Sequence, residues 1–406
     1  MKQKKTSVNR RHFLKSSFLG ASGIVAGAAG LKAQGTFAES EENDSVKMIY
    51  RTLGNTGIKL PILSMGVMRA DNPNLVRAAL DKGIVHLDTA NSYQKGRNEE
   101  MLGELLKDYP RDSFVLATKI GVAGKDRKTG LYGEEATEED FMKKFDVSMK
   151  RLGLDYVDIL YHHAISTREA ALHKPILAAM KKVKESGRVR HLGISTHRNE
   201  PEVIMAAIES EVYELVLTSY NFKQEHIKEM DEAIKKASDA GLGVVAMKTM
   251  AGGFLDKERN QPVNAKAALK WALKNPNIHT SIPGFTSFDQ LDDDLSIFRD
   301  MELTEEEKKD ILLAQTSQGL YCTGCEECLD QCKKGLNIPD LMRAYMYTYG
   351  YHELAKAKEL VTDLNLPSNV CSDCGECTVH CTKGFSVADK VKDIHRIMEV
   401  PSDFIV

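Results

Sequence analysis

Eight cysteines could bind metal, and all of them lie in the last quarter of this 406-residue chain. They form two runs with the same spacing, C-x2-C-x2-C-x3-C, in which one tight loop presents three thiolates to a single cluster. The fourth cysteine of such a run typically reaches the other cluster, so the set suits two [4Fe-4S] clusters. The sequence therefore predicts a redox protein with the metal ligands Cys322, Cys325, Cys328, Cys332, Cys371, Cys374, Cys377 and Cys381.

Other uses of these cysteines fit the sequence less well. Disulfides suit small secreted scaffolds, but the rest of this long chain contains no cysteine. Zinc sites usually show two CxxC pairs well apart, rather than four cysteines within eleven residues. Residues 322–338 and 371–387 also match in glycine and lysine positions, which indicates an internal duplication. Unlike a plain ferredoxin, the chain has Lys333 and Thr382 instead of proline after each fourth cysteine.

The N-terminus carries the pattern of an export signal. The sequence NRRHFLK at residues 9–15 precedes a short apolar run, residues 16–31, rich in glycine and alanine. This resembles a twin-arginine signal in which Asn9 replaces the usual serine or threonine. The run is shorter and less apolar than a transmembrane helix, which needs about 20 residues. We expect residues 1–38 to be a signal peptide cut after Ala38, with Ala33 as the alternative position.

Such a signal would take the folded, cluster-loaded protein through the twin-arginine export machinery to the periplasm or another extracytoplasmic space. A basic, disordered arm is the alternative. Residues 1–38 carry seven Lys or Arg and no acid, so removing them changes the formal charge from −3 to −10. A chain this acidic has no basic surface to follow phosphates, so we expect no nucleic-acid partner. We also expect no stable membrane span after signal removal.

Residues 48–310 alternate short apolar runs with amphipathic stretches. After a linker at residues 39–47, a short hairpin is expected about residues 55–57. Eight β-then-α units within about 250 residues indicate a (β/α)8 TIM barrel. An open doubly wound sheet is the competitor, but no G-x-G-x-x-G follows the first strand. The expected strands are residues 62–66, 84–88, 114–119, 157–163, 189–195, 215–220, 244–248 and 280–283.

Residues 311–406 are expected to form a small, mostly helical, ferredoxin-like iron–sulfur domain. A helix that begins near residue 304 and runs to about 318 leads to the first cysteine run. Residues 338–366, between the runs, have a helical pattern. We interpret their tyrosines as packing around the clusters in preference to electron relays; they are Tyr345, Tyr347, Tyr349 and Tyr351.

Three side chains end barrel strands, where such enzymes place their chemistry, and a fourth follows shortly after one of them. Asp88 ends the second expected strand, Lys119 the third and His163 the fourth, and Tyr93 follows five residues after Asp88. A tyrosine is a weak acid at neutral pH, and an adjacent ammonium stabilises its phenolate. Asp88 could position that ammonium at Lys119, while His163 could orient a carbonyl oxygen.

These residues lie in a set of motifs that resembles the aldo/keto reductase family over roughly residues 50–300. The motifs are DTANSY at 88–93, GRNEEMLGELL at 96–106, GLDYVDIL at 153–160 and GIS at 193–195. The resemblance implies an NAD(P)-dependent oxidoreductase in which Tyr93 is the general acid, Lys119 and Asp88 support it, and His163 meets the carbonyl. His162 is the neighbouring possibility. We choose His163 because the family histidine is the fifth residue after the aspartate of VD, here Asp158.

The same resemblance suggests cofactor contacts, with departures from the family pattern. Ser195 and Thr196 fall where the nicotinamide amide is bound, but Leu217 replaces the usual glutamine and Met247 an aromatic ring. Gly284 and Gln290 replace the cations that bind a 2′-phosphate, which favours NAD over NADP or indicates weakened nucleotide affinity. Residues 247–253, MKTMAGG with Met247 and Lys248, resemble the MKxxxGG motif of a subgroup with a C-terminal ferredoxin-like domain.

Three functions remain open from the sequence. The first is an exported enzyme that reduces a small carbonyl compound, or oxidises an alcohol, by hydride transfer. The second is an electron-transfer protein whose clusters exchange electrons with a redox partner protein, while the barrel binds an organic ligand without nucleotide. Hydride carries two electrons and each cluster one, and no flavin motif is present to divide the pair. In the third, the clusters only stabilise the C-terminal domain.

Overall fold

The computed structural model describes residues 47–126, 128–252, 262–316, 321–322, 324–367, 370–371 and 374–405. The chain separates into two units, residues 1–45 and 46–406, and the described residues all belong to the second. The expected signal peptide, both cleavage positions and residues 39–46 of the expected linker therefore lie outside the described part of the chain.

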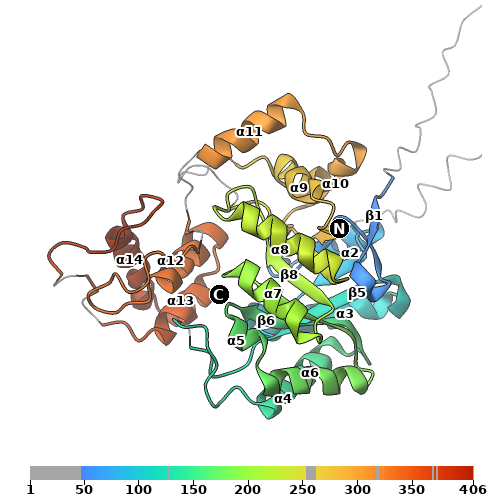
Figure 1. Ribbon diagram of the computed structural model, residues 1–406, viewed down its shortest axis with the longest axis horizontal. Coiled ribbons are helices and arrows are strands. Elements are labelled where there is room, and N and C mark those ends of the chain that lie inside the picture. Colours follow the sequence, from blue (N-terminus) through green and yellow to red (C-terminus); the bar gives the residue numbers. More distant parts are fainter. Residues whose placement is uncertain are drawn as a thin grey trace, which may run out of the picture. The chain divides into compact units, whose positions relative to one another are not determined.

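Parallel strands form a nearly closed barrel, as the sequence predicts (Figure 1). Neighbouring strands pair in chain order, and each of the eight strands expected from the sequence corresponds to one of those observed. Short apolar runs give such strands because both faces of a barrel sheet are covered. The strands are β3 (Met65–Gly66), β4 (His86–Asp88), β5 (Val115–Ile120), β6 (Val157–Ile165), β7 (Val189–Thr196), β8 (Leu215–Ser219), β9 (Gly243–Met247) and β10 (Thr280–Ser281).

Backbone hydrogen bonds next to the first and last strands close the barrel. Ser64 N donates to Ser281 O at 2.8 Å, and Gly66 N donates to Pro283 O at 2.9 Å. Gly66 permits this approach, because a Cβ at that position would lie 2.8 Å from the carbonyl oxygen of Ile282. Closure brings the C-terminal strand ends to one rim, where side chains from distant parts of the sequence can meet.

A hairpin covers the other end of the barrel. β1 (Tyr50–Thr52) and β2 (Lys59–Pro61) pair antiparallel, which confirms the hairpin expected about residues 55–57. Leu53 and Leu60 are fully buried in the apolar cluster of the barrel interior. Leu53 packs against Gly243, at the start of β9, where a Cβ would lie 2.6 Å from the leucine side chain. The hairpin therefore seals the end that faces away from the predicted catalytic residues.

Amphipathic helices surround the barrel, because each buries one apolar face against the sheet. The helix over residues 138–152 shows the usual signals at its ends: Thr137 Oγ1 accepts from Asp140 N at 3.1 Å, and Gly153 follows with φ of 62°. The barrel helices are α2 (Pro73–Asp81), α3 (Arg97–Leu105), α4 (Glu138–Leu152), α5 (Arg168–Ala171), α6 (Lys174–Glu185), α7 (Glu200–Ser210), α8 (Ile227–Asp239), α9 (Ala265–Lys274) and α10 (Phe288–Leu295).

One more helix, α11 (Glu305–Thr316), spans the boundary expected between residues 310 and 311. Its Ile311 and Ala314 are buried in one apolar cluster with Ala267 and Ala268 of α9. This packing attaches the helix to the barrel, because its apolar face would otherwise be exposed. The chain therefore leaves the barrel after α11.

The residues after α11 form a small helical domain with its own apolar core. α12 (Ile338–Met346) follows the first cysteine run, and α14 (Val387–His395) follows the second. A π-helical turn (Tyr347–Tyr351) and α13 (Leu354–Asp363) lie between them, as the helical pattern predicts. Figure 1 shows α12, α13 and α14 grouped together. Their buried side chains include Leu341, Val361, Val391 and Ile394.

The two cysteine runs end in the same local structure. Gly335 N donates to Cys332 O, and Gly384 N donates to Cys381 O, each at 2.8 Å. Both glycines have a left-handed backbone, with φ of 66° and 70°. A helix then begins at the matching position of each repeat. These equivalences support the internal duplication inferred from the sequence.

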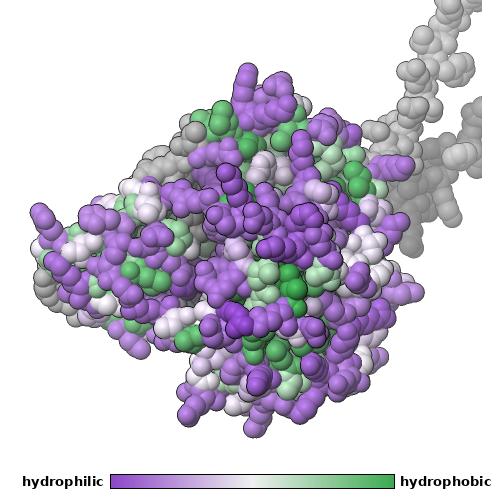
Figure 2. All heavy atoms as spheres, in the orientation of Figure 1, coloured by the Kyte–Doolittle hydropathy of each residue, from purple (hydrophilic) through white to green (hydrophobic). Residues whose placement is uncertain are grey.

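Hydrophilic side chains predominate on the face shown in Figure 2, with hydrophobic residues in small groups among them. Leu312 and Leu313 of α11 and Phe404 are among the exposed large apolar side chains. Within the described ranges, no helix has both the length and the apolar character needed to cross a bilayer.

Candidate functional site

The structure brings the four predicted catalytic side chains to one rim of the barrel. Asp88 is the last residue of β4, Lys119 lies near the end of β5, and His163 lies in β6. Tyr93 begins a 3₁₀ turn shortly after β4. β5 pairs with both β4 and β6, so the three strand ends are adjacent. This adjacency follows from the parallel barrel, not from closeness in the sequence.

Lys119 contacts two other members of this group. Its Nζ donates hydrogen bonds to Asp88 Oδ1, to Thr89 O at 2.7 Å and to Tyr93 Oη at 3.2 Å. The Lys119 and Asp88 side chains are only 2% and 3% exposed. Burial alone would lower the pKa of Lys119, but the Asp88 carboxylate and the Tyr93 phenol raise it overall. Lys119 therefore stays protonated and can stabilise a phenolate at Tyr93.

His163 faces this group, whereas its neighbour His162 does not. The His163 ring centre lies 6.0 Å from that of Tyr93, edge to face at 79°. Burial, together with nearby lysines, lowers the pKa of His163 well below its usual value, so the imidazole is neutral. His162 is instead hydrogen bonded on both ring nitrogens, to Tyr132 Oη at 2.7 Å and Tyr213 Oη at 2.9 Å. Of the two histidines, His163 therefore lies beside Tyr93, whereas both ring nitrogens of His162 are already engaged.

The hydroxyls expected to bind the cofactor amide are engaged within the protein. Ser195 Oγ accepts a hydrogen bond from Ala164 N at 2.8 Å, where the pairing of β6 with β7 is irregular. Thr196 Oγ1 donates to Arg198 O at 2.9 Å. Ser195 and Thr196 are 1% and 0% exposed. Both hydroxyls are therefore used in hydrogen bonds within the rim.

Apart from Lys248, the other positions that match nucleotide contacts of the family lie in the barrel or after β10, and Leu217 is one of the departures from that pattern. Leu217 is fully buried in the barrel interior, and Met247 packs against the same apolar cluster. Gly284 is exposed in the loop after β10. Gln290 is exposed as well, and its Oε1 accepts hydrogen bonds from Thr286 N at 2.8 Å and Thr286 Oγ1 at 3.0 Å. These four residues offer no charged group to a cofactor.

The remaining expected contact, Lys248, lines a polar pocket of about 150 Å³. Gly252 also lines it from the barrel, and Cys322 and Arg343 line it from the C-terminal domain. The Lys248 side chain is reached by solvent through the pocket, yet surrounding protein and then Arg343 lower its pKa to about 7. Lysine, arginine and a glycine-containing loop suit phosphate oxygens. This donor set fits the anionic part of a nucleotide, although Ser195 and Thr196 as placed do not fit its amide.

The eight cysteines form two groups, and each group combines both runs. One contains Cys322, Cys325, Cys328 and Cys381, and the other contains Cys371, Cys374, Cys377 and Cys332. Burial raises the pKa of the Cys328 thiol to about 11, and repulsion between neighbouring thiolates of its group adds to this. Three thiols from one run and the fourth from the other is the arrangement expected of two [4Fe-4S] clusters.

Local contacts are compatible with clusters in both groups. Gly324 N donates to Cys322 Sγ at 3.3 Å, as backbone amides do around cluster sulfurs. Thr382, at the position where ferredoxins carry proline, lies with its Oγ1 3.6 Å from Cys325 Sγ. The second group of cysteines lines its own pocket. In the described part of the chain, no three histidine, cysteine or carboxylate side chains converge at the spacing of a single metal ion.

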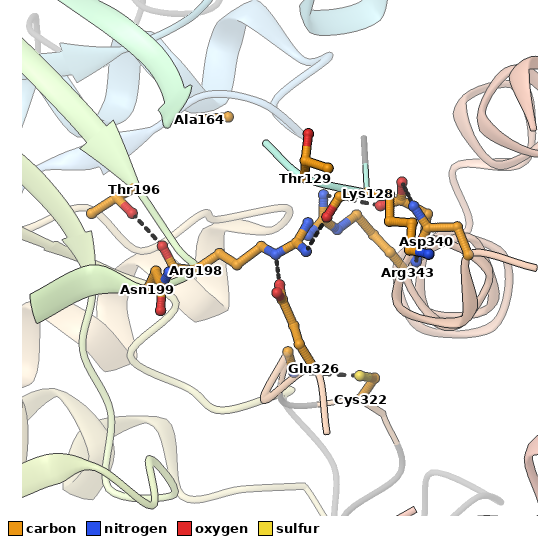
Figure 3. Close-up of polar contacts among 12 residues, drawn as sticks. Lys128, Thr129, Ala164, Thr196, Arg198, Asn199, Cys322, Glu326, Asp340 and Arg343 are labelled. Atoms are coloured by element: carbon orange, nitrogen blue, oxygen red, sulfur yellow. Dashed lines mark hydrogen bonds and ion pairs between the residues drawn. The ribbon is translucent and has the colours of Figure 1, made fainter. Parts of the chain in front are cut away.

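Two arginines that the sequence analysis missed lie near the first group (Figure 3). Arg198, just after β7, forms an ion pair with Glu326 inside the first cysteine run. Arg343 of α12 lies 3.7 Å from Asp340, measured from Nη1 to Oδ1. Both arginines are close enough to Cys322 to interact with its thiolate. Neither belongs to a motif, so only the tertiary structure could reveal them.

Comparison with known proteins agrees with this architecture. The model of the aldo/keto reductase family matches residues 57–267, and the model of the 4Fe-4S dicluster domain matches residues 321–386. The first match covers more than half of the chain. The chain therefore belongs to the aldo/keto reductase family, and it carries a 4Fe-4S dicluster domain after the barrel.

The chain is similar to reductases over most of the length of those proteins. L-glyceraldehyde 3-phosphate reductase from Escherichia coli O157:H7 is 26% identical over 331 residues, 67% of this chain and 92% of that protein. Probable aldo-keto reductase 1 from Glycine max is 24% identical, over 68% of this chain and 92% of that protein. Among solved structures, the holo form of aldo-keto reductase AKR11C1 from Bacillus halodurans superposes with a TM-score of 0.55 at 22% identity. The superposition covers 68% of this chain and 99% of the chain of that structure.

Proposed function

We propose that this oxidoreductase reduces the carbonyl group of a small molecule, or oxidises the corresponding alcohol, at the rim of the barrel. The observation that carries the proposal is the contact of buried Lys119 with both Asp88 and Tyr93. A structural lysine would need only the carboxylate. Directing the same ammonium at a phenolic oxygen, beside the neutral imidazole of His163, suits proton transfer to a carbonyl oxygen.

Each residue of this group has a distinct part in the proposed reaction. Tyr93 Oη gives its proton to the carbonyl oxygen, and Lys119 stabilises the phenolate that results. His163 donates an N–H to the same oxygen and so orients the carbonyl. Asp88 keeps Lys119 in position. A bound nicotinamide nucleotide would supply the hydride to the carbonyl carbon, and in alcohol oxidation the phenolate of Tyr93 takes the proton back.

Lys248 and Arg343 would bind the phosphates of that nucleotide. Gln290 is bonded to Thr286, and the 2′-phosphate of NADP would find no cation there. We therefore propose NAD in preference to NADP. The test is anaerobic incubation of the cluster-loaded protein with benzaldehyde and nicotinamide nucleotide deuterated at C4. Deuterium at the carbinol carbon of the product would support hydride transfer, and its absence with both NADH and NADPH would contradict it.

A second function, electron transfer without nucleotide, has one observation in its favour. Cys322 and Cys325 line the same pocket as Lys248, so a ligand there would lie next to the first cluster. In that case the barrel would bind an organic redox ligand, and a partner protein would exchange electrons with the clusters. Mass spectrometry of the denatured, natively produced protein separates the two functions. About one NAD or NADP per chain supports the first, whereas no nucleotide and no calorimetric binding supports the second.

We also propose that the protein acts outside the cytoplasm. The twin-arginine pattern at Arg10 and Arg11 is the support, because that route carries proteins already folded and loaded with cofactor. Clusters, and any nucleotide, would then be acquired before export. A tightly bound nucleotide that is reduced or oxidised again through the clusters would suit a compartment without a free nucleotide pool.

A further inference from the structure

The dicluster domain contributes a lysine to the neighbourhood of the proposed catalytic tyrosine. Lys356 lies in α13, and its Nζ is 5.6 Å from the centre of the Tyr93 ring. The same ammonium lies 4.7 Å from the centre of the Tyr347 ring and 3.8 Å from Met68 Sδ. Lys356 is partly buried at this position. A residue outside the barrel therefore stands beside the reactive group within it.

Lys356 differs from neighbouring cations in its partners. Each of three other cations has a carboxylate partner: the pairs are Lys119–Asp88, Arg198–Glu326 and Arg343–Asp340. Within the part of the chain that the structure describes, no carboxylate lies within ion-pair distance of Lys356. Its contacts are aromatic rings and a thioether, which do not neutralise a positive charge.

The charge of Lys356 affects the pKa of other groups at the rim. It contributes to lowering the pKa of His163 and of Lys248, in each case after burial and another cation. His163 lies in β6 and Lys248 directly follows β9, so Lys356 adds to a positive field across this part of the rim. An ammonium without a carboxylate partner can pair with an anionic ligand, and such a pair is stronger at a partly buried position than in open solvent.

We propose that Lys356 binds an oxyanion, a carboxylate or a phosphate, carried by the carbonyl substrate. The inference rests on the proposed function, and it names the substrate class of that same site. Tyr93 and His163 would meet the carbonyl group, and the ammonium of Lys356, beside the Tyr93 ring, would meet the acidic group. The dicluster domain would then determine substrate specificity as well as carry clusters.

A purely structural role makes a different prediction. If Lys356 only joined the two domains through the rings of Tyr93 and Tyr347, its loss would weaken binding of neutral and anionic ligands alike. Lys358, two residues further along α13, is a matched control because its Nζ donates to Val400 O within the dicluster domain. Lys356→Arg keeps the positive charge, whereas Lys356→Met keeps an unbranched apolar side chain of similar size and removes the charge.

The test is calorimetric titration of the anaerobic, cluster-loaded protein with benzoate, phenyl phosphate and neutral benzyl alcohol. The wild type should bind at least one anion more tightly than benzyl alcohol, and which anion it prefers distinguishes a carboxylate from a phosphate. Lys356→Met should weaken anion binding roughly 10-fold or more, as expected for a lost hydrogen bond to a charged group. Lys356→Arg should restore most of it, and Lys358→Met should bind like the wild type.

Kinetics provide a second readout. The ratio of kcat/KM for 4-carboxybenzaldehyde to that for benzaldehyde should fall roughly 10-fold in Lys356→Met. An unchanged ratio, no preference of the wild type for anions, or equal loss of anion and alcohol binding would each overturn the inference. If the wild type reduces no carbonyl compound at all, the proposed function fails, while the calorimetry still decides whether Lys356 binds an anion.

Discussion

The ammonium nitrogen of Lys119 lies 3.2 Å from the phenolic oxygen of Tyr93, and the lysine is buried against Asp88. A charged lysine in this position favours the ionised form of its tyrosine neighbour. The distance is a hydrogen-bonding one, so Tyr93 can lose its proton to a ligand without any movement of the lysine.

Replacing Tyr93 by phenylalanine should therefore affect the chemical step. Tyr93→Phe retains the ring and removes the acid, and general acid catalysis contributes roughly 10²–10⁴-fold. We expect kcat for carbonyl reduction to fall by that factor, while calorimetric binding of nucleotide stays within about twofold of the wild type. Tyr109→Phe is the control, because Tyr109 Oη donates to Asp81 on the surface at 3.3 Å. Full turnover by Tyr93→Phe would assign proton donation to another residue.

Paired cysteine substitutions should reveal how the runs share their clusters. Cys325 and Cys381 belong to one group, so Cys325→Ala/Cys381→Ala should spare the other cluster and leave about four irons per chain. Cys325→Ala/Cys332→Ala removes one ligand from each group and should damage both clusters. Iron and sulfide assays with EPR spectra of the dithionite-reduced proteins measure the difference. The reverse pattern would mean that each run binds its own cluster.

Arg343 should raise the reduction potential of the first cluster. Its positive charge interacts with Cys322 and favours the reduced, more negative cluster. In Arg343→Met we expect that potential to fall by roughly 30–100 mV, the size of one screened charge at short range. Lys392, which interacts with Cys371, is the matched residue for the second cluster. EPR-monitored titrations should show each substitution shifting a different signal, and a common shift of both signals would contradict the assignment.

The barrel should lose stability in mild acid because of His86. This histidine of β4 is fully buried, neither ring nitrogen has a hydrogen-bond partner in the described protein, and burial lowers its pKa to about 3. The unfolded chain gains this proton below its ordinary pKa of 6.5, whereas the folded barrel does not until about 3. Stability is thus complete above pH 6.5 and falls as the pH drops through that window.

The expected size of the effect makes it measurable. Between pH 7.5 and 5.5 His86 should cost about 1 kcal/mol of the free energy of unfolding, since one pH unit corresponds to about 1.4 kcal/mol per proton. Urea unfolding followed by fluorescence of Trp271, the single tryptophan, reports on the barrel. His86→Met should have a flatter dependence on pH, and an unchanged slope would assign the acid sensitivity elsewhere.

Export should depend on the twin arginines. Arg10→Lys/Arg11→Lys keeps the positive charge but removes the pattern that the export machinery recognises. We expect the double variant to remain inside the cell with residues 1–38 attached, as measured by fractionation and by the mass of the intact chain. Unchanged localisation would leave these residues as a basic arm of another kind.

The barrel could be predicted from the sequence because the signals that specify its strands and helices are local. Each strand is a short apolar run with a helix beside it, and a helix such as α4 begins after Thr137 and ends before Gly153, both local signals. The rim residues followed as well, since Asp88 and Lys119 end consecutive strands of a parallel barrel. The cysteine runs were evident for the same reason, because their ligand spacing is a property of one loop.

The tertiary structure alone decided which of these groups face one another and which are already engaged. His162 and His163 are adjacent in sequence, and the hydrogen bonds of His162 to two tyrosines separate their roles. Ser195 matched a cofactor contact by position, but its hydroxyl accepts a backbone N–H of the neighbouring strand. Lys356 lies more than 260 positions from Tyr93, in another domain, and reaches its ring only through folding. Sequence patterns record local periodicity and spacing, whereas charge pairing and long-range contact depend on how separate elements pack.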